Sequence, residues 1–237
     1  MKTETLNLTA ADGPVFPAYV ARPDGTLRGG IVVLQEIFGV NAHIRAVADS
    51  YAAQGYLAIA PSTFHRVQTG DEQGTALGVE LGYTPDDVAA GAALKAAVEA
   101  LPSPGALQDV QAAINEAAKA GKVAVVGYCW GGLLTWRAAC TLSGISAAVP
   151  YYGGGMTTPL ETARQPQCPV LAHFGDQDHA IPMEGVRAFE AAQATVQVAV
   201  YSAKHGFNCD HRAAFDATAA AQARLRTLAF LAQHLAR

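Results

Sequence analysis

A cysteine lies between two glycines in the stretch GYCWGG, where an apolar run gives way to a segment of helical character. The spacing G-x-C-x-G, from Gly127 to Gly131, is typical of a sharp strand-to-helix turn that holds a nucleophile clear of a sheet. Glycine lacks a Cβ and so permits the close backbone approach in such a turn. A helix N-terminus favours a thiolate, and the next backbone N–H can face an oxyanion. We therefore predict Cys129 as a nucleophile and Trp130 as an oxyanion donor.

Two further residues complete a set that could perform nucleophilic catalysis. The stretch GDQDHAIP places Asp178 after one apolar run, and KHGF places His205 after the next. The order nucleophile, acid, base is one that hydrolytic triads use on open α/β sheets, where ligands bind at the carboxyl ends of strands. Taken singly, an inert thiol, a turn aspartate and a loop histidine would account for these residues. Their order and positions together predict a Cys-His-Asp triad.

The elements that must position these residues alternate along the chain. Residues 4–10 and 15–23 are joined by the turn ADGP and predict an antiparallel ribbon. Nearly continuous apolar runs then predict strands buried on both faces at 29–39 and 56–62. Further strands are expected at 122–129, 145–154, 168–178 and 196–207. Helical spacing is found at 43–55, 87–100, 107–121, 131–142, 182–194 and 213–236. The alternation predicts a mostly parallel, doubly wound α/β sheet that follows an N-terminal antiparallel ribbon.

Composition narrows the function classes. The 237 residues are 51% hydrophobic and 15% charged, with a formal net charge of −4. No basic stripe suggests nucleic acid, the apolar runs are too short to span a membrane, and the N-terminus lacks the apolar run of a signal peptide. We expect a single cytoplasmic domain over residues 1–237 that acts as a monomer on a small molecule. Residues 62–85 form a variable loop expected to lie near the site.

Neither a metal nor a cofactor is expected. The four cysteines show no zinc-site spacing. The histidines that could suggest a metal are scattered and also lack ligand spacing: His43, His65, His173 and His179.

The motifs QEIFGVNAHIR, GYCWGG, GDQDHAIP and KHGF, in this order, resemble those of the dienelactone hydrolase family. The resemblance implies an α/β-hydrolase fold, with Cys129 as nucleophile and His205 as base. It assigns the residue that orients the histidine to the second aspartate of its motif, Asp178, rather than to Asp176.

The same resemblance gives roles to two neighbouring residues near the N-terminus. Glu36, in QEIFG, matches the family glutamate that contacts the cysteine and takes its proton when substrate arrives. A buried glutamate satisfied by backbone groups is the alternative for this residue. Ile37 matches the position whose N–H completes the oxyanion hole with Trp130.

The match fails where the family holds a substrate carboxylate with two arginines. Cys209 occupies the place of one, and no arginine matches the other, which the family has in the variable loop, since none occurs between Arg66 and Arg137. Arg66 and Arg212 are the basic residues near these loops, and neither matches an anchoring position. Since arginine is the residue suited to binding both carboxylate oxygens, this absence predicts a neutral rather than a dicarboxylic substrate.

Three residues are candidates for contacting that substrate: Cys209, Tyr83 and Arg66. The acidic residues of the variable loop, Asp71, Glu72 and Glu80, would repel an acidic substrate if they faced the site.

The predicted activity is hydrolysis of a carboxylic ester or lactone. The thiol attacks the carbonyl to give a thioester, and water assisted by His205 then releases the acid. Two alternatives stay open on the sequence: acyl transfer to a nucleophile other than water, and small-molecule binding without catalysis.

Overall fold

The computed structural model describes residues 1–68 and 77–236, and it contains one eight-stranded sheet with the order β1-β2-β4-β3-β5-β6-β7-β8. The strands are β1 (Lys2–Thr9), β2 (Val15–Arg22), β3 (Gly30–Leu34), β4 (Leu57–Pro61), β5 (Val123–Tyr128), β6 (Ile145–Tyr151), β7 (Val170–Gly175) and β8 (Val196–Tyr201). β1 pairs with β2 and β2 with β4 in antiparallel register, and all other neighbours are parallel. The predicted α/β fold with its N-terminal ribbon is therefore confirmed.

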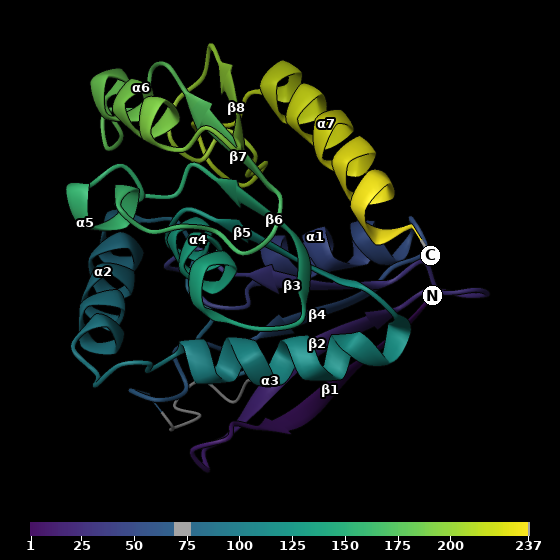
Figure 1. Cartoon of the computed structure of the whole chain (residues 1–237). Helices are drawn as coiled ribbons and strands as arrows, with labels where there is room; N and C mark the ends of the chain where they lie inside the picture. The colour runs from purple at the N-terminus through teal and green to yellow at the C-terminus, as the bar shows by residue number, and fades with distance from the viewer. Residues whose placement is uncertain (69–76, 237) are drawn as a thin grey trace.

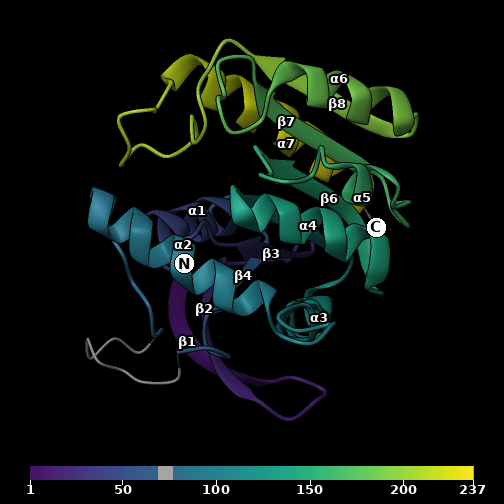
Figure 2. The same ribbon diagram turned by 90° about the vertical axis from the view of Figure 1, so that its left-hand side faces the viewer.

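The helices lie on both faces of the sheet. They are α1 (Ala42–Ala52), α2 (Pro85–Glu99), α3 (Leu107–Ala117), α4 (Trp130–Thr141), α5 (Pro159–Thr162), α6 (Met183–Ala192) and α7 (Ala217–Leu235). α3 and α4 contact the central strands on one face, while α1 and α7 contact the sheet on the other (Figure 1). Seen from the side, the sheet runs from the β1–β2 ribbon at one edge to β7 and β8 at the other (Figure 2).

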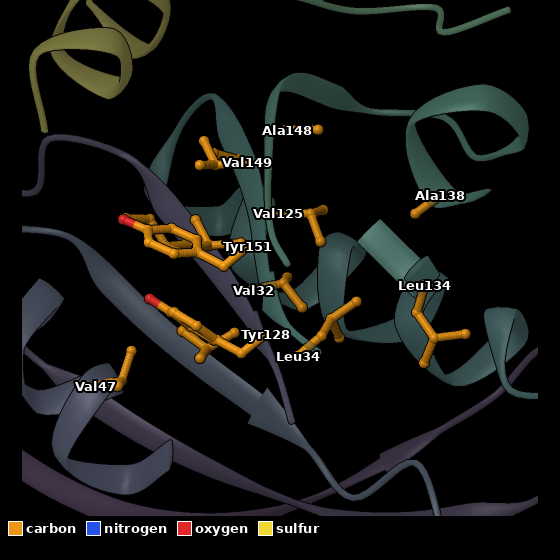
Figure 3. Close-up of a cluster of buried hydrophobic side chains, with 14 of the residues drawn as sticks. Val32, Leu34, Val47, Val125, Tyr128, Leu134, Ala138, Ala148, Val149 and Tyr151 are labelled. Atoms are coloured by element: carbon orange, nitrogen blue, oxygen red, sulfur yellow. The ribbon is translucent and has the colours of Figure 1, made fainter. Parts of the chain in front are cut away.

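The central strands are buried because helices cover both of their faces. Every residue of β3, β4 and β5 is buried, which explains their continuous apolar sequence. Val32, Val125 and Val149 lie within this core, and the rings of Tyr128 and Tyr151 pack beside each other at 4.7 Å between centroids (Figure 3). The loops at the strand ends are thus attached to a closely packed core.

Parallel register brings four sequence-distant loops to one edge of the sheet. Leu34 of β3 pairs with Gly127 of β5, and Gly175 of β7 pairs with Tyr201 of β8. The loops after these four strands carry Glu36, Cys129, Asp178 and His205. The fold therefore gathers the predicted catalytic residues at the carboxyl ends of the strands.

Two short elements and one loop differ from the sequence expectation. The sequence pattern did not predict the single-turn helix α5 or the 3-10 turn Ala118–Ala120. The segment 62–85 includes an isolated antiparallel bridge between Gly39 and Glu80, so it is tied to the loop that follows Glu36. Asp71 and Glu72 lie outside the described residues. Among the described helices, none combines the length and the apolar character needed to cross a bilayer.

Candidate active site

Cys129 sits in a strained turn between β5 and α4. Its φ is 54° and its ψ is −116°, a left-handed backbone that non-glycine residues rarely adopt. The flanking glycines make the turn possible: a Cβ on Gly127 would lie 2.1 Å from the carbonyl oxygen of Gly131, and one on Gly131 would lie 2.4 Å from that of Leu34. Gly127 and Gly131 are therefore required by the close backbone packing of this turn.

Asp178 holds His205 firmly. The His205 Nδ1–H donates to Asp178 Oδ2 at 2.7 Å, and Asp178 Oδ1 accepts from the backbone N–H groups of Ala180 and Ile181 at 2.8 and 3.2 Å. Burial opposes the charge of His205, but hydrogen bonds to Asp178 and Cys129 outweigh it and raise the pKa of His205 from 6.5 to about 10. The structure therefore brings Cys129, His205 and Asp178 together.

Glu36 is 1% exposed, and it is partnered on one side only. Arg212 Nη1 donates to Glu36 Oε1 at 3.1 Å, whereas Oε2 has no hydrogen-bond partner among the described residues. Burial lowers the pKa of Arg212, but the charges of Glu36 and Cys129 outweigh it and raise the pKa. Glu36 and Cys129 are thus neighbours of the same guanidinium.

Arg212 lies in the site, although motif matching did not place it there. Its guanidinium carbon lies 5.6 Å from the centre of the Phe38 ring. A Cβ on Gly206 would lie 2.4 Å from Arg212 Nη1, so the glycine of KHGF makes room for this side chain. No sequence signal would have located Arg212, because its partner Glu36 lies 176 residues earlier.

Tyr83 and Cys209 form a neutral wall beside Glu36. The Cys209 thiol donates to the Tyr83 hydroxyl at 3.3 Å, and Asn41 Nδ2 donates to the same hydroxyl at 3.0 Å. Burial and the nearby Glu36 raise the pKa of Cys209 to about 11, and burial raises the pKa of Tyr83 further above its usual value. Both groups are therefore uncharged at neutral pH.

Arg66 does not join this group, in contrast to the sequence expectation. Its guanidinium donates to both oxygens of Asp109, at 2.9 and 2.7 Å, and to both oxygens of Asp12, at 2.7 and 2.9 Å. Asp109 is fully buried, so the pair has a structural role. Four of its five N–H donors are engaged by these carboxylates, and this is why Arg66 is unsuited to binding substrate.

The two proposed oxyanion donors are held by different parts of the fold. α2 packs closely over Ile37, since a Cβ on Gly91 would lie 2.2 Å from the Ile37 carbonyl oxygen. The Trp130 ring stacks on Phe64 at 5.1 Å, and its Nε1–H donates to Glu99 Oε1 at 2.9 Å. Sequence analysis missed Glu99 and Phe64, because both lie far from the nucleophile motif along the chain.

The sheet order, with Cys129, His205 and Asp178 at the carboxyl ends of its strands, is that of the α/β-hydrolase fold. The sequence model of the dienelactone hydrolase family matches residues 16–235. The chain is 34% identical over 240 residues to the carboxymethylenebutenolidase of Pseudomonas putida, across 98% of this chain and 97% of that protein. The chain belongs to the dienelactone hydrolase family, and it is a carboxylic ester hydrolase.

Solved structures agree with this family. A Klebsiella pneumoniae crystal structure described as a dienelactone hydrolase is 31% identical, with a TM-score of 0.78, covering 98% of this chain and 100% of that one. A dienelactone hydrolase-like promiscuous phosphotriesterase from metagenomic libraries has a TM-score of 0.73 at 22% identity, covering 99% of both chains. The second likeness shows the shared fold alone.

Proposed function

We propose that this hydrolase cleaves a neutral carboxylic ester or lactone through a Cys129-His205-Asp178 triad and a thioester intermediate. The observation that carries the proposal is the Asp178–His205 hydrogen bond of 2.7 Å beside a cysteine held at a φ of 54°. A carboxylate only accepts hydrogen bonds, so His205 donates through Nδ1 and its Nε2 is directed to chemistry.

In the acylation step, Cys129 Sγ attacks the carbonyl carbon while its proton passes to Glu36. The unpartnered Oε2 of Glu36 is the oxygen open to that proton. The oxyanion is stabilised by the backbone N–H groups of Ile37 and Trp130. The intermediate collapses to a thioester, and the departing alkoxide takes the proton that His205 carries.

In the deacylation step, neutral His205 accepts a proton from water, which attacks the thioester carbonyl. Cys129 Sγ then leaves and recovers the proton that Glu36 has held. The products are an acid and an alcohol, and every group returns to its starting protonation state. Once the thiol is acylated, the hydrogen bond that His205 donates to Cys129 and that raises the pKa of His205 is lost, which makes the imidazole a better base for this step.

The charges around Glu36 support a neutral substrate. Arg212 is already paired with Glu36, Tyr83 and Cys209 are neutral, and Arg66 is bound to two aspartates. A substrate carboxylate would have to take Arg212 from Glu36, and the described residues supply no second free arginine at the site. A neutral ester or lactone leaves the Glu36–Arg212 pair intact.

Intact-mass spectrometry tests the thioester. The protein is exposed to activated esters and lactones, and the mass increase of one acyl group should appear and then decay. Cys129→Ala should show neither the added mass nor hydrolysis, while Cys140→Ala, which removes a half-buried thiol on α4, should match the parent. Full activity in Cys129→Ala would overturn the assignment. Added alcohols or amines separate hydrolysis from acyl transfer by the products formed.

A further inference from the structure

We infer that Glu36, His43 and Cys209 form a binding site for Zn²⁺, and that the bound ion inhibits the hydrolase by occupying Glu36. One ligand atom from each residue lies within 4.8 Å of the other two, and all three residues are buried. The inhibition rests on the proposed function, because it requires Glu36 to be the base for Cys129. The binding of the metal does not depend on that function.

Glu36 and His43 each have one side-chain atom engaged and one left without a partner. Glu36 binds Arg212 through Oε1, and His43 binds Asp210 through Nδ1 at 3.1 Å. Among the described residues, Glu36 Oε2 and His43 Nε2 have no hydrogen-bond partner, and both are buried. Buried polar atoms in folded proteins are nearly always satisfied, so two such atoms in one cluster indicate a missing partner.

The engaged atoms supply the outer contacts that a metal site needs. A metal-binding histidine typically donates its other ring N–H to a carboxylate, which fixes its tautomer. The His43–Asp210 pair has this arrangement. Because Nδ1 is engaged by Asp210, the buried and unpartnered Nε2 of His43 is the nitrogen that can act as a ligand.

The ligand chemistry selects the ion. A thiolate, an imidazole and a carboxylate together are typical of Zn²⁺, which takes four ligands and can keep a water in the fourth position. The Cys209 thiol gives up its proton to solvent as the sulfur binds the metal. The charges then balance, because Zn²⁺ and Arg212 together offset Glu36, the Cys209 thiolate and Asp210.

Occupation of Glu36 by metal would stop the enzyme. A metal bound to Oε2 removes the oxygen that takes the Cys129 proton, while Oε1 stays on Arg212. The bound ion would thus be an inhibitor on the proposed base, and it would take no part in the reaction. Chelation should restore full activity.

Metal titration of the full-length chain tests the site. Co²⁺ is the spectroscopic probe, since a cobalt–thiolate bond gives a charge-transfer absorption band, and Zn²⁺ affinity is measured by competition. Binding should be stoichiometric at one ion per chain. Cys209→Ser should abolish the band, and His43→Gln should weaken Zn²⁺ binding at least tenfold. Asp210→Asn, at an exposed position, should weaken it about ten- to a hundredfold and replaces His43→Gln if that variant does not fold.

Cys129→Ser is the matched control, because Cys129 and His205 form the other thiol–imidazole pair. This variant should keep both the band and the affinity. Absence of metal binding, or a band that survives in Cys209→Ser and disappears in Cys129→Ser, would overturn the site. Binding at the predicted residues without inhibition of the parent enzyme would leave the site in place and contradict the role of Glu36 as base.

Discussion

Two buried carboxylates of the candidate site, Asp178 and Glu36, are held in different ways. Asp178 is 4% exposed and accepts three hydrogen bonds, two from backbone groups two and three residues later and one from His205. Glu36 is 1% exposed, and among the described residues it receives one hydrogen bond, from Arg212. The Asp178 loop fixes its carboxylate by local contacts, whereas Glu36 depends on a distant guanidinium.

These contacts suit the two carboxylates to different proposed roles, Asp178 to orienting His205 and Glu36 to accepting the proton of Cys129. The backbone N–H donors of Ala180 and Ile181 fix the position of the Asp178 carboxylate, so that it can hold His205 in one orientation. A buried oxygen without a donor is available to a proton or a cation. The predictions below separate these two roles.

The largest effect on catalysis is expected for the predicted nucleophile, Cys129. Cys129→Ala should lower kcat/KM by roughly four to six orders of magnitude, as loss of a triad nucleophile does elsewhere. In the parent, iodoacetamide should label Cys129 faster than the other three cysteines, which peptide mapping can measure. Equal labelling of Cys129 and the buried Cys209 would contradict a nucleophilic role.

Loss of the orienting carboxylate should be nearly as severe. Asp178→Asn should reduce kcat by about 10³–10⁴-fold, because the amide cannot hold His205 in its productive tautomer. Asp176→Asn is the matched control, since Asp176 lies two residues earlier and is exposed. Steady-state kinetics on one activated ester compares the two. Similar losses of kcat in both variants would mean that activity depends on the structure of the loop rather than on the carboxylate of Asp178.

Glu36→Gln should lower kcat by about 10²-fold, the scale of a general base. The rate of Cys129 alkylation should fall with it, because the thiol loses its proton acceptor. Glu80→Gln removes a nearby carboxylate that pairs with Arg45 at 2.7 Å and serves as control. If Glu36→Gln alkylates and hydrolyses at the parent rate, Glu36 is a structural residue only.

A comparison of neutral and anionic substrates tests whether Arg212 stays paired with Glu36 during the reaction. A neutral lactone or short aryl ester should exceed dienelactone in kcat/KM by about tenfold or more, because a charge-assisted pair contributes about 1.5–3 kcal/mol. The comparison needs only the parent enzyme and Arg212→Ala. Dienelactone preferred by tenfold, with Arg212→Ala removing that preference, would show that Arg212 leaves Glu36 to bind the substrate.

The last prediction concerns how the stability of the folded protein depends on pH through the Asp178–His205 pair. Because the pKa of His205 is raised from 6.5 to about 10 in the folded protein, its stabilising contribution is complete below pH 6.5. The contribution is lost as the pH rises to 10. The free energy of unfolding should fall by a few kcal/mol over this range, and Tm should fall with it by several degrees. Thermal melts of Asp178→Asn should show a flatter dependence, and identical slopes would contradict the prediction.

Local sequence determined the elements and the motifs that the fold uses. The glycines around Cys129 predicted the strained turn because a Cβ at either position would collide with backbone. Continuous apolar runs predicted the central strands because both sheet faces are covered. The expectations of one cytoplasmic domain that acts as a monomer stay predictions.

Only the tertiary structure decided which side chains meet across the site. It brought Arg212 to Glu36, kept Arg66 on Asp12 and Asp109, and placed Glu99 on the Trp130 indole. The proposed metal site also depends on tertiary structure, because Cys209 comes from a part of the chain far from Glu36 and His43. The physical reason is the distance along the chain over which each interaction acts. A turn or strand is fixed by sterics and burial over a few residues, whereas a charge pair depends on how distant elements pack and on which partner each buried atom can reach.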